Sequence, residues 1–197
     1  MPTFEFYSSS KVLNENRIFL RDLKQRYYHA GLESVGRDIH EVAYFLKKEI
    51  EILKPDRVVF VGCSMGGFAA ILFASLVGFG EVIAFCPQTF ISPWLRFRHG
   101  DNRWRGHVIR TYGISLFKSK AWNLRPLVAK AKGRLKLSIY VCSKNSLDCI
   151  HAKHLAGLPN VQIYTFPKGG HFIAKYLKKE GYLPAILAGT YVHTTEV

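Results

Sequence analysis

The sequence predicts an α/β fold: a doubly wound, mostly parallel sheet of about six strands in a single domain, residues 1–197. Three observations support this prediction. Short apolar runs rich in β-branched and aromatic residues alternate with stretches that show helical spacing. Hydrophobic residues make up 48% of the chain, which is enough to bury a core with helices on both sheet faces. A length of 197 residues fits one domain, and repeated strand–helix units favour right-handed crossovers.

The expected elements follow one another in this alternating order. Strands are expected at 3–7, 17–20, 57–61, 81–86, 137–142 and 161–166, and helices at 39–53, 66–77, 151–156 and 172–187. Helix 39–53 has the clearest pattern, because its apolar residues recur every three or four positions on one face. Asp38 is placed to cap this helix with Glu41 as its reciprocal partner, and Pro55 ends it.

The most informative stretch is the turn between strand 57–61 and helix 66–77. It reads Gly62-Cys63-Ser64-Met65-Gly66, a G-x-S-x-G pattern placed between a strand and a helix. This context is typical of a nucleophile elbow, in which a strained serine stands exposed above the sheet. Glycines flank the serine because the neighbouring helix and strand come too close for side chains. The alternative is an ordinary tight turn, and the strand and helix around the motif argue against it.

Two later loops supply the partners that a catalytic serine needs. Strand 137–142 is followed by a loop with Asp148, and strand 161–166 by a loop with Gly169, Gly170 and His171. The chain order Ser, Asp, His is the order of this kind of triad, and the loops converge where parallel strands end. The alternatives are structural: Asp148 as the N-cap of helix 151–156, and His171 as a local packing or capping residue.

Other acids and histidines compete less well for these roles. Asp101 and Asp22 are weaker rivals for the triad acid. His151 and His154 have the i, i+3 spacing of metal ligands, but no third ligand accompanies them, so we expect surface positions and no metal.

The chain as a whole, from about Asn16 to about Leu187, resembles a small α/β-hydrolase. The resemblance is carried by residues 62–67, Asp148 and His171, and by the local segments RIFLRD (17–22), YYHAGL (27–32), GCSMGGFAA (62–70) and AFCPQT (84–89). These segments are similar to those of small bacterial hydrolase-like proteins encoded with glycosyltransferases for surface polysaccharides. The chain departs from lipases and esterases in lacking an HGGG motif. It is also short for the fold, which implies a reduced version with one or two edge strands missing.

The expected chemistry follows from the triad. His171 takes the proton of Ser64, which attacks an acyl carbonyl, while Asp148 orients the imidazole. Backbone N–H groups of Met65 and Leu23 are expected to bind the oxyanion. Asp22, Tyr28 and Gln88 are possible pocket residues. The glycine-rich turn lacks the Lys-Ser/Thr ending of a phosphate-binding loop, and no cofactor is required.

Residues 90–136, which we call the insertion, interrupt the strand–helix alternation and are expected to form a cap or lid. Residues 94–136 contain twelve Lys or Arg against one acid, Asp101, and so carry +11 of the net +14. Trp94, Trp104 and Trp122 are interleaved with these charges. We expect the insertion to flank the Ser64 pocket and to attract an anionic ligand, such as a glycan, a CoA ester, a nucleotide-linked donor or a membrane face. The alternative is a solvated basic face without a specific ligand.

The cysteines and the apolar runs indicate whether the protein binds a metal or enters a membrane. The four cysteines, including Cys63 beside the serine, lack metal-ligand spacing and are expected to be reduced and mostly buried. No apolar run reaches the length of a membrane span, and the first ten residues lack the pattern of a signal peptide, so we expect a cytoplasmic protein. No specific nucleic-acid binding is expected.

Three functional hypotheses remain open. The first is an esterase-like serine hydrolase acting on an acyl ester of a small molecule or glycan. The second is an acyltransferase with the same triad, which differs in water access and acceptor binding. The third is a non-catalytic, hydrolase-like binding protein in surface polysaccharide assembly, associated with a glycosyltransferase or peripherally with a membrane.

Overall fold

The structure, a computed structural model, describes residues 4–115 and 119–192. Its centre is a parallel sheet of four strands: β1 (Val59–Cys63), β2 (Gly80–Phe85), β3 (Leu135–Cys142) and β4 (Val161–Phe166). The strands lie in the order β1-β2-β3-β4, so each crossover adds a strand on the same side of the previous one. This confirms the α/β class and the parallel sheet, with fewer strands than the six expected.

The register of the sheet aligns the carboxyl ends of all four strands. Cys63 lies beside Phe85 on β2, and Cys142 of β3 lies beside Phe166 of β4. Phe85 in turn pairs with Tyr140, two residues before the end of β3. The loops that leave these ends therefore share one edge of the sheet, where ligands bind in open α/β sheets.

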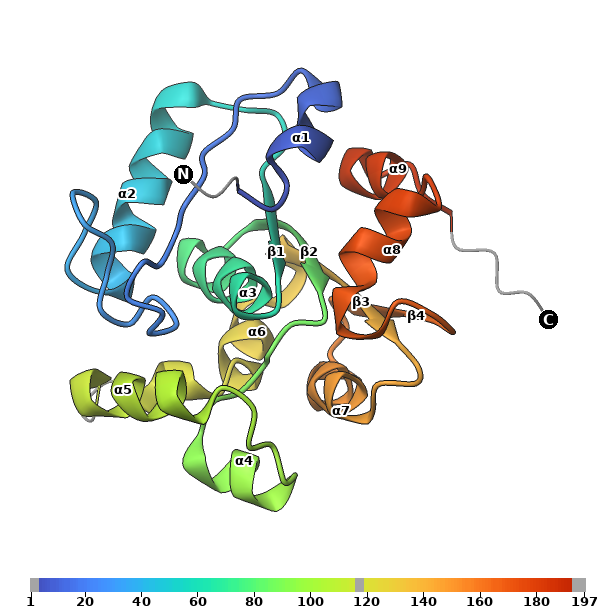
Figure 1. Cartoon of the computed structure of the whole chain (residues 1–197). Coiled ribbons are helices and arrows are strands. Elements are labelled where there is room, and N and C mark those ends of the chain that lie inside the picture. Colours follow the sequence, from blue (N-terminus) through green and yellow to red (C-terminus); the bar gives the residue numbers. More distant parts are fainter. Residues whose placement is uncertain (1–3, 116–118, 193–197) are drawn as a thin grey trace.

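Helices cover both faces of this sheet (Figure 1). The crossovers contain α3 (Met65–Val77), α6 (Arg125–Ala131) and α7 (Ser146–Leu155). The C-terminal helices α8 (Ile173–Lys179) and α9 (Leu183–Ala188) lie on the other side of the sheet from α6 and α7. The expected single helix 172–187 is thus two helices, separated where Gly181 adopts a φ of 81°.

The core is organised around α3. This helix is apolar on every side, as expected for a helix enclosed by its neighbours, and residues 67–74 and Val77 are buried. It packs on β1 and β2, and α2 (Ile39–Leu53) and α6 lie against it. Gly78, with a φ of 96°, ends α3 in the left-handed conformation that glycine adopts without strain.

Helix α2 has the expected bounds and the expected cap. Asp38 Oδ1 accepts hydrogen bonds from the backbone N–H groups of His40 (2.8 Å) and Glu41 (3.1 Å). The Glu41 carboxylate accepts from the backbone N–H of Arg37 (2.8 Å), one residue before the donor that the sequence suggested. The buried residues of α2 lie on the predicted apolar face and are Ile39, Val42, Ala43 and Leu46.

The strands expected at 3–7 and 17–20 are absent from the described residues, of which Thr3 is not one. The chain instead forms the short helices α1 (Tyr7–Ser10) and η1 (Lys11–Leu13), and residues 14–22 belong to neither a helix nor a strand. The aromatic residues that suggested strands contact one another and the core through their rings. The ring centroids of Phe4 and Phe19 are 5.1 Å apart, and those of Phe6 and Phe85 are 5.5 Å apart.

The insertion connects β2 to β3 and contains two different parts. Its second half contains η2 (Ser119–Trp122), α6 and η3 (Lys132–Arg134). Val128 of α6 is fully buried. The last two residues of the insertion, 135–136, already belong to β3. Its first half is α4 (Pro93–Arg98) and α5 (Arg105–Ser115), which lie at the periphery in Figure 1. We call residues 93–115 the α4–α5 segment. Among the described residues, no helix is both long and apolar enough to cross a membrane.

The cap of α2 gives a stability prediction. Asp38→Ala removes the acceptor for two backbone N–H groups at the start of the helix, so we expect a loss of about 1 kcal/mol in the free energy of unfolding. Urea titration followed by circular dichroism measures it. Asp56→Ala, in the exposed loop before β1, is the matched control. Equal effects of the two substitutions would contradict the role of the cap.

Candidate active site

Three polar residues leave the aligned strand ends and meet. Ser64 directly follows β1, Asp148 lies in the first turn of α7 after β3, and His171 lies in η4 (Gly170–Phe172) after β4. His171 Nε2 is 3.0 Å from Ser64 Oγ. His171 Nδ1 is 2.9 Å from Asp148 Oδ2 and 3.1 Å from Oδ1. These atoms form one continuous hydrogen-bonded chain across the sheet edge.

The position of each proton follows from its partners. Asp148 can only accept in its charged form, so His171 Nδ1 carries the ring hydrogen and donates it to the carboxylate. His171 Nε2 is then a free acceptor for the Ser64 hydroxyl. The Asp148 side chain is 1% exposed and that of His171 is 21% exposed, so the acid is enclosed while the base remains accessible.

The turn at Ser64 has the strain of a nucleophile elbow. Ser64 adopts φ 53° and ψ −115°, a conformation that costs energy for a non-glycine residue and is typical of functional sites. A Cβ on Gly62 would lie 2.0 Å from the carbonyl oxygen of Gly66, and one on Gly67 would lie 2.9 Å from Pro87. Glycine is therefore required at Gly62 by the close approach of β1 and α3, and at Gly67 by the close approach of Pro87 after β2.

Local structure also fixes the two partners. The Asn145 side chain caps α7 and accepts from the backbone N–H of Asp148 (3.2 Å). Asn145, and not Asp148, is thus the N-cap, and α7 starts five residues earlier than expected. Gly169 and Gly170 have φ values of 106° and 55°, which turn the chain sharply from β4 into His171.

The charge of Asp148 is held by its neighbours. Burial alone would raise the pKa of this carboxyl, but hydrogen bonds from His171 and from Arg103 outweigh it and lower the pKa. Arg103 Nη1 lies 2.7 Å from Asp148 Oδ1. Asp148 is therefore ionised at neutral pH and able to orient His171.

A thiol lies beside this pair. Cys86 Sγ and one ligand atom each of Asp148 and His171 lie within 4.8 Å of one another, the one such three-residue group found among the described residues. Burial raises the pKa of the Cys86 thiol far above neutral, and Asp148 raises it further. The thiol is thus protonated, whereas a metal needs a thiolate. Because Asp148 and His171 are also bonded to each other, the donor set fits a hydrogen-bonded chain better than a metal site.

No family model and no curated protein matches the sequence, whereas solved structures do match. Est816, described as an N-acyl homoserine lactone degrading enzyme, has a TM-score of 0.53 and 17% identity over 80% of this chain and 76% of its own. The capsule O-acetyltransferase of Neisseria meningitidis serogroup A has a TM-score of 0.54 and 15% identity over 73% of this chain and 63% of its own.

A third match is MGS-M2, an α/β hydrolase from a deep-sea metagenome library. Its TM-score is 0.51 and its identity 18%, over 80% of this chain and 74% of its own. The chain has the α/β-hydrolase fold. At these identities the likeness establishes the fold, and the chemistry has to be argued from the site.

In this α/β-hydrolase fold, the residues expected to line the pocket are mainly structural. Asp22 Oδ2 accepts from the backbone N–H groups of Arg26 (2.6 Å) and Tyr28 (2.9 Å), which shapes the loop before α2. Gln88 Oε1 accepts from the buried Tyr27 hydroxyl (2.7 Å). Tyr28 is itself buried. The Leu23 side chain is 74% exposed, and the oxyanion role of the Leu23 and Met65 backbone stays a prediction.

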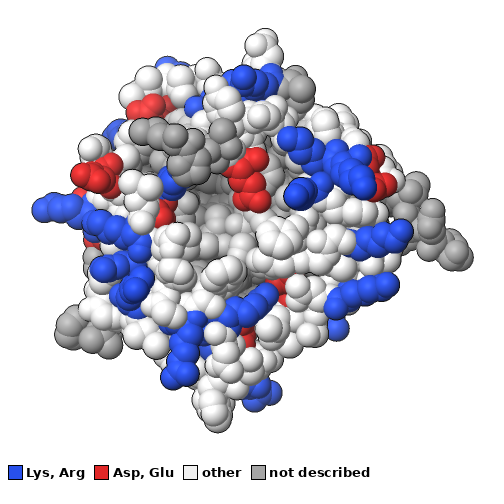
Figure 2. All heavy atoms as spheres, in the orientation of Figure 1, with Lys and Arg blue, Asp and Glu red and all other residues white. Residues whose placement is uncertain are grey.

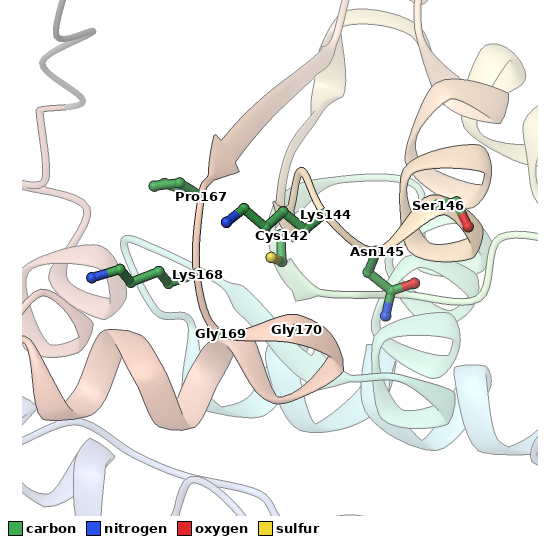
Figure 3. Close-up of a pocket in the computed structure, with 8 residues that line it drawn as sticks. All are labelled: Cys142, Lys144, Asn145, Ser146, Pro167, Lys168, Gly169 and Gly170. Atoms are coloured by element: carbon green, nitrogen blue, oxygen red, sulfur yellow. The ribbon is translucent and has the colours of Figure 1, made fainter.

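An open pocket lies next to the triad, between the loops that follow β3 and β4 (Figure 3). Its volume is about 510 Å³, and it is lined by Cys142, Lys144, Asn145, Ser146, Pro167, Lys168, Gly169 and Gly170. Asp148 and His171 follow its lining residues closely in the chain, but neither of them lines it. Lys144 and Lys168 give it a positive charge.

The expectation that His151 and His154 lie on the surface is wrong. His151 is fully buried; its Nδ1 accepts from the backbone N–H of Thr89 (3.1 Å), and its Nε2 lies 2.9 Å from Asp101 Oδ2. His154 is partly buried, with Nε2 2.7 Å from Asn123 Oδ1. The signal was present in the spacing, because His151 shares the i, i+4 helical face of the buried Leu155.

Because His151 and His154 are removed from water, we expect the folded protein to lose stability at acidic pH. Burial, aided by the positive charge of Arg125, lowers the pKa of His154 to about 4, and burial also lowers that of His151. The unfolded chain binds protons at histidine below about pH 6.5, so folding stability falls as the pH drops from about 6.5 towards 4. Thermal melts across this range measure the loss. His154→Gln should flatten the pH dependence, whereas His40→Gln, at an exposed position of α2, should leave it unchanged; a steep dependence retained in His154→Gln would refute this cause.

Proposed function

We propose that the protein is an esterase-like serine hydrolase that cleaves acyl esters. The observation that carries the proposal is the continuous chain from Ser64 through His171 to Asp148, built on a strained elbow at the carboxyl edge of the sheet. Its distances are within the range in which nucleophile, base and orienting acid act as a unit. The hydrolase and acyltransferase structures with this fold support the same reaction class.

The mechanism follows from the protonation states. As Ser64 Oγ attacks the acyl carbon, its proton passes to His171 Nε2, and Asp148 stabilises the imidazolium through Nδ1–H. His171 then protonates the leaving alcohol. In the second half-reaction, water gives a proton to His171 and attacks the acyl-enzyme, which releases the acid and restores Ser64. Backbone N–H groups at Met65 and Leu23 are our candidates for oxyanion donors.

An acyltransferase is the second candidate, and one comparison favours it. The capsule O-acetyltransferase that shares the fold is also described in complex with CoA, as an H228A mutant with a TM-score of 0.50 and 16% identity over 81% of this chain and 68% of its own. In this variant of the mechanism, a sugar hydroxyl would take the place of water. Incubation with acetyl-CoA, with and without an acetyl acceptor, separates the two: hydrolysis releases acetate without acceptor, whereas transfer requires one.

We also propose that the substrate is anionic, and the exposed positive charges support this. In the α4–α5 segment, Arg98, Arg105 and Arg110 are exposed, while its single acid, Asp101, is buried. Figure 2 shows a hollowed centre with both basic and acidic side chains at its edge, and mostly blue and white atoms over α4 and α5. Such a field raises the encounter rate of anions with a nearby cleft. Arg96 is buried and Arg103 is bound to acids, so these two are not part of the attraction.

The first prediction here concerns the nucleophile. Ser64→Ala should abolish labelling by a fluorophosphonate probe and reduce kcat on p-nitrophenyl acetate by about 10⁴-fold or more, and His171→Ala should cost nearly as much, because the two act together. Circular dichroism should remain unchanged. Ser146→Ala, on an exposed serine of the neighbouring pocket, is the matched control. Equal labelling of the wild type and Ser64→Ala would exclude Ser64 as the nucleophile.

The second prediction concerns charge. The double change Arg98→Glu and Arg105→Glu should lower kcat/KM for acetyl-CoA and flatten its dependence on salt, because screening at physiological ionic strength acts over about 8 Å. Activity on neutral p-nitrophenyl acetate should barely change. The double change Lys47→Glu and Lys178→Glu, at exposed positions of α2 and α8, controls for net charge. Identical responses of both substrates would show that the segment does not steer anions.

A further inference from the structure

An arginine from the α4–α5 segment reaches the acid of the proposed triad. Arg103 lies in the loop between α4 and α5, and its Nη1 donates to Asp148 Oδ1 at 2.7 Å. The side chains are 23% and 1% exposed, so the pair is largely enclosed. A charged donor at this distance makes a strong, charge-assisted hydrogen bond. In the proposed proton transfer, Asp148 acts only through its contact with His171.

The same guanidinium is held by a second carboxylate. Arg103 Nε and Nη2 donate to Asp101 Oδ1 (3.1 Å) and Oδ2 (3.3 Å), a two-pronged contact that a lysine ammonium is unable to reproduce. The backbone N–H of Arg103 also donates to Asp101 Oδ1 (3.0 Å). The planar fork is therefore fixed on one edge by Asp101 and offers its remaining edge to Asp148.

Asp101 leads back to the helix that carries the triad acid. Because the backbone N–H of Thr89 occupies His151 Nδ1, the ring hydrogen of His151 is on Nε2, which donates to Asp101 Oδ2 (2.9 Å). His151 and Asp148 are three residues apart in α7. The contacts thus form a closed circuit from α7 through Asp148, Arg103, Asp101 and His151 back to α7.

We propose that Arg103 is a positioning residue that holds Asp148 in the orientation His171 requires and offsets part of its charge. The inference rests on the proposed function. Arg103 binds Oδ1, which leaves Oδ2 directed at His171 Nδ1, where the shorter contact is observed. Its positive charge also limits how far Asp148 favours the imidazolium over the neutral ring. The α4–α5 segment is thereby tied to the reacting groups.

Other titratable groups also lie near Asp148 and His171. Cys86 lies beside both Asp148 and His171 and stays protonated. Glu5, near Cys63, interacts electrostatically with His171. Asp101 and His151 complete the circuit on the Arg103 side. Substituting Arg103 leaves Cys86 and Glu5 in place but removes donors from Asp101, so a change in the titration of His171 reports the loss of the guanidinium together with the response of Asp101 and His151.

The test compares Arg103→Met, Arg103→Lys and the matched control Arg134→Met, an exposed arginine outside the α4–α5 segment. In Arg103→Met we expect kcat on p-nitrophenyl acetate to fall about 10- to 100-fold with KM little changed, because the acid is misplaced rather than the substrate. The acidic limb of the pH–rate profile should move up by about one pH unit, because Asp148 then favours the imidazolium more strongly. Arg103→Lys should keep the limb near its wild-type position and recover part of kcat.

A second readout does not depend on turnover. The NMR titration of the His171 ring should move to higher pH in Arg103→Met and stay in place in Arg134→Met. An unchanged His171 titration in a folded Arg103→Met protein, or a lower melting temperature with kcat and pH profile unchanged, would overturn the inference. Failure of the proposed function looks different, since the wild type itself would then resist the fluorophosphonate probe. If Arg103→Met does not fold, Arg103→Lys carries the test through kcat, because its single ammonium is unable to bind both carboxylates.

Discussion

The buried charge of Asp148 is the constraint around which this site is organised. A carboxylate removed from water is unstable unless hydrogen-bond donors and positive charge replace its hydration. Here His171 and Arg103 supply them, and the two residues come from different parts of the chain. Arg103 in turn needs Asp101 to fill its other donors, and Asp101 takes one further donor from His151. One buried acid therefore accounts for a network that joins α7, the loop after β4 and the α4–α5 segment.

The sheet makes this network possible by bringing its parts to one edge. Parallel strands in sequential order end at the same level, so residues as far apart as Ser64 and His171 meet without a long loop. The strain at Ser64 is balanced by the rigid elements on both sides, since Gly62 lets β1 and α3 approach closely and Gly67 makes room for Pro87. The core around α3 thus has a functional consequence: it holds a conformation that an isolated turn would leave.

The fold class could be predicted from the sequence, and Ser64, Asp148 and His171 could be selected as candidates, because both predictions depend on local patterns and on chain order. The strand ends, the glycines and the loop residues are all visible within short windows. The strands at 3–7 and 17–20 were wrong because alternating aromatic residues can pack by their rings without a ladder partner. Arg103 was missed for a different reason. Its partner Asp148 lies 45 residues away, and no local spacing distinguishes a paired arginine from the exposed ones around it.

The arginines of the α4–α5 segment show why net charge alone is an incomplete guide. Arg96 and Arg103 face inward and are balanced by Asp101 and Asp148, whereas Arg98, Arg105 and Arg110 face solvent. A count of +11 for residues 94–136 sums two different uses of the same side chain. The inward pair stabilises an ionised acid in a dry environment, and the outward set creates a field that salt can screen. Within the α4–α5 segment, sensitivity to ionic strength therefore arises from the exposed set, while the charge of Asp148 depends on the buried pair.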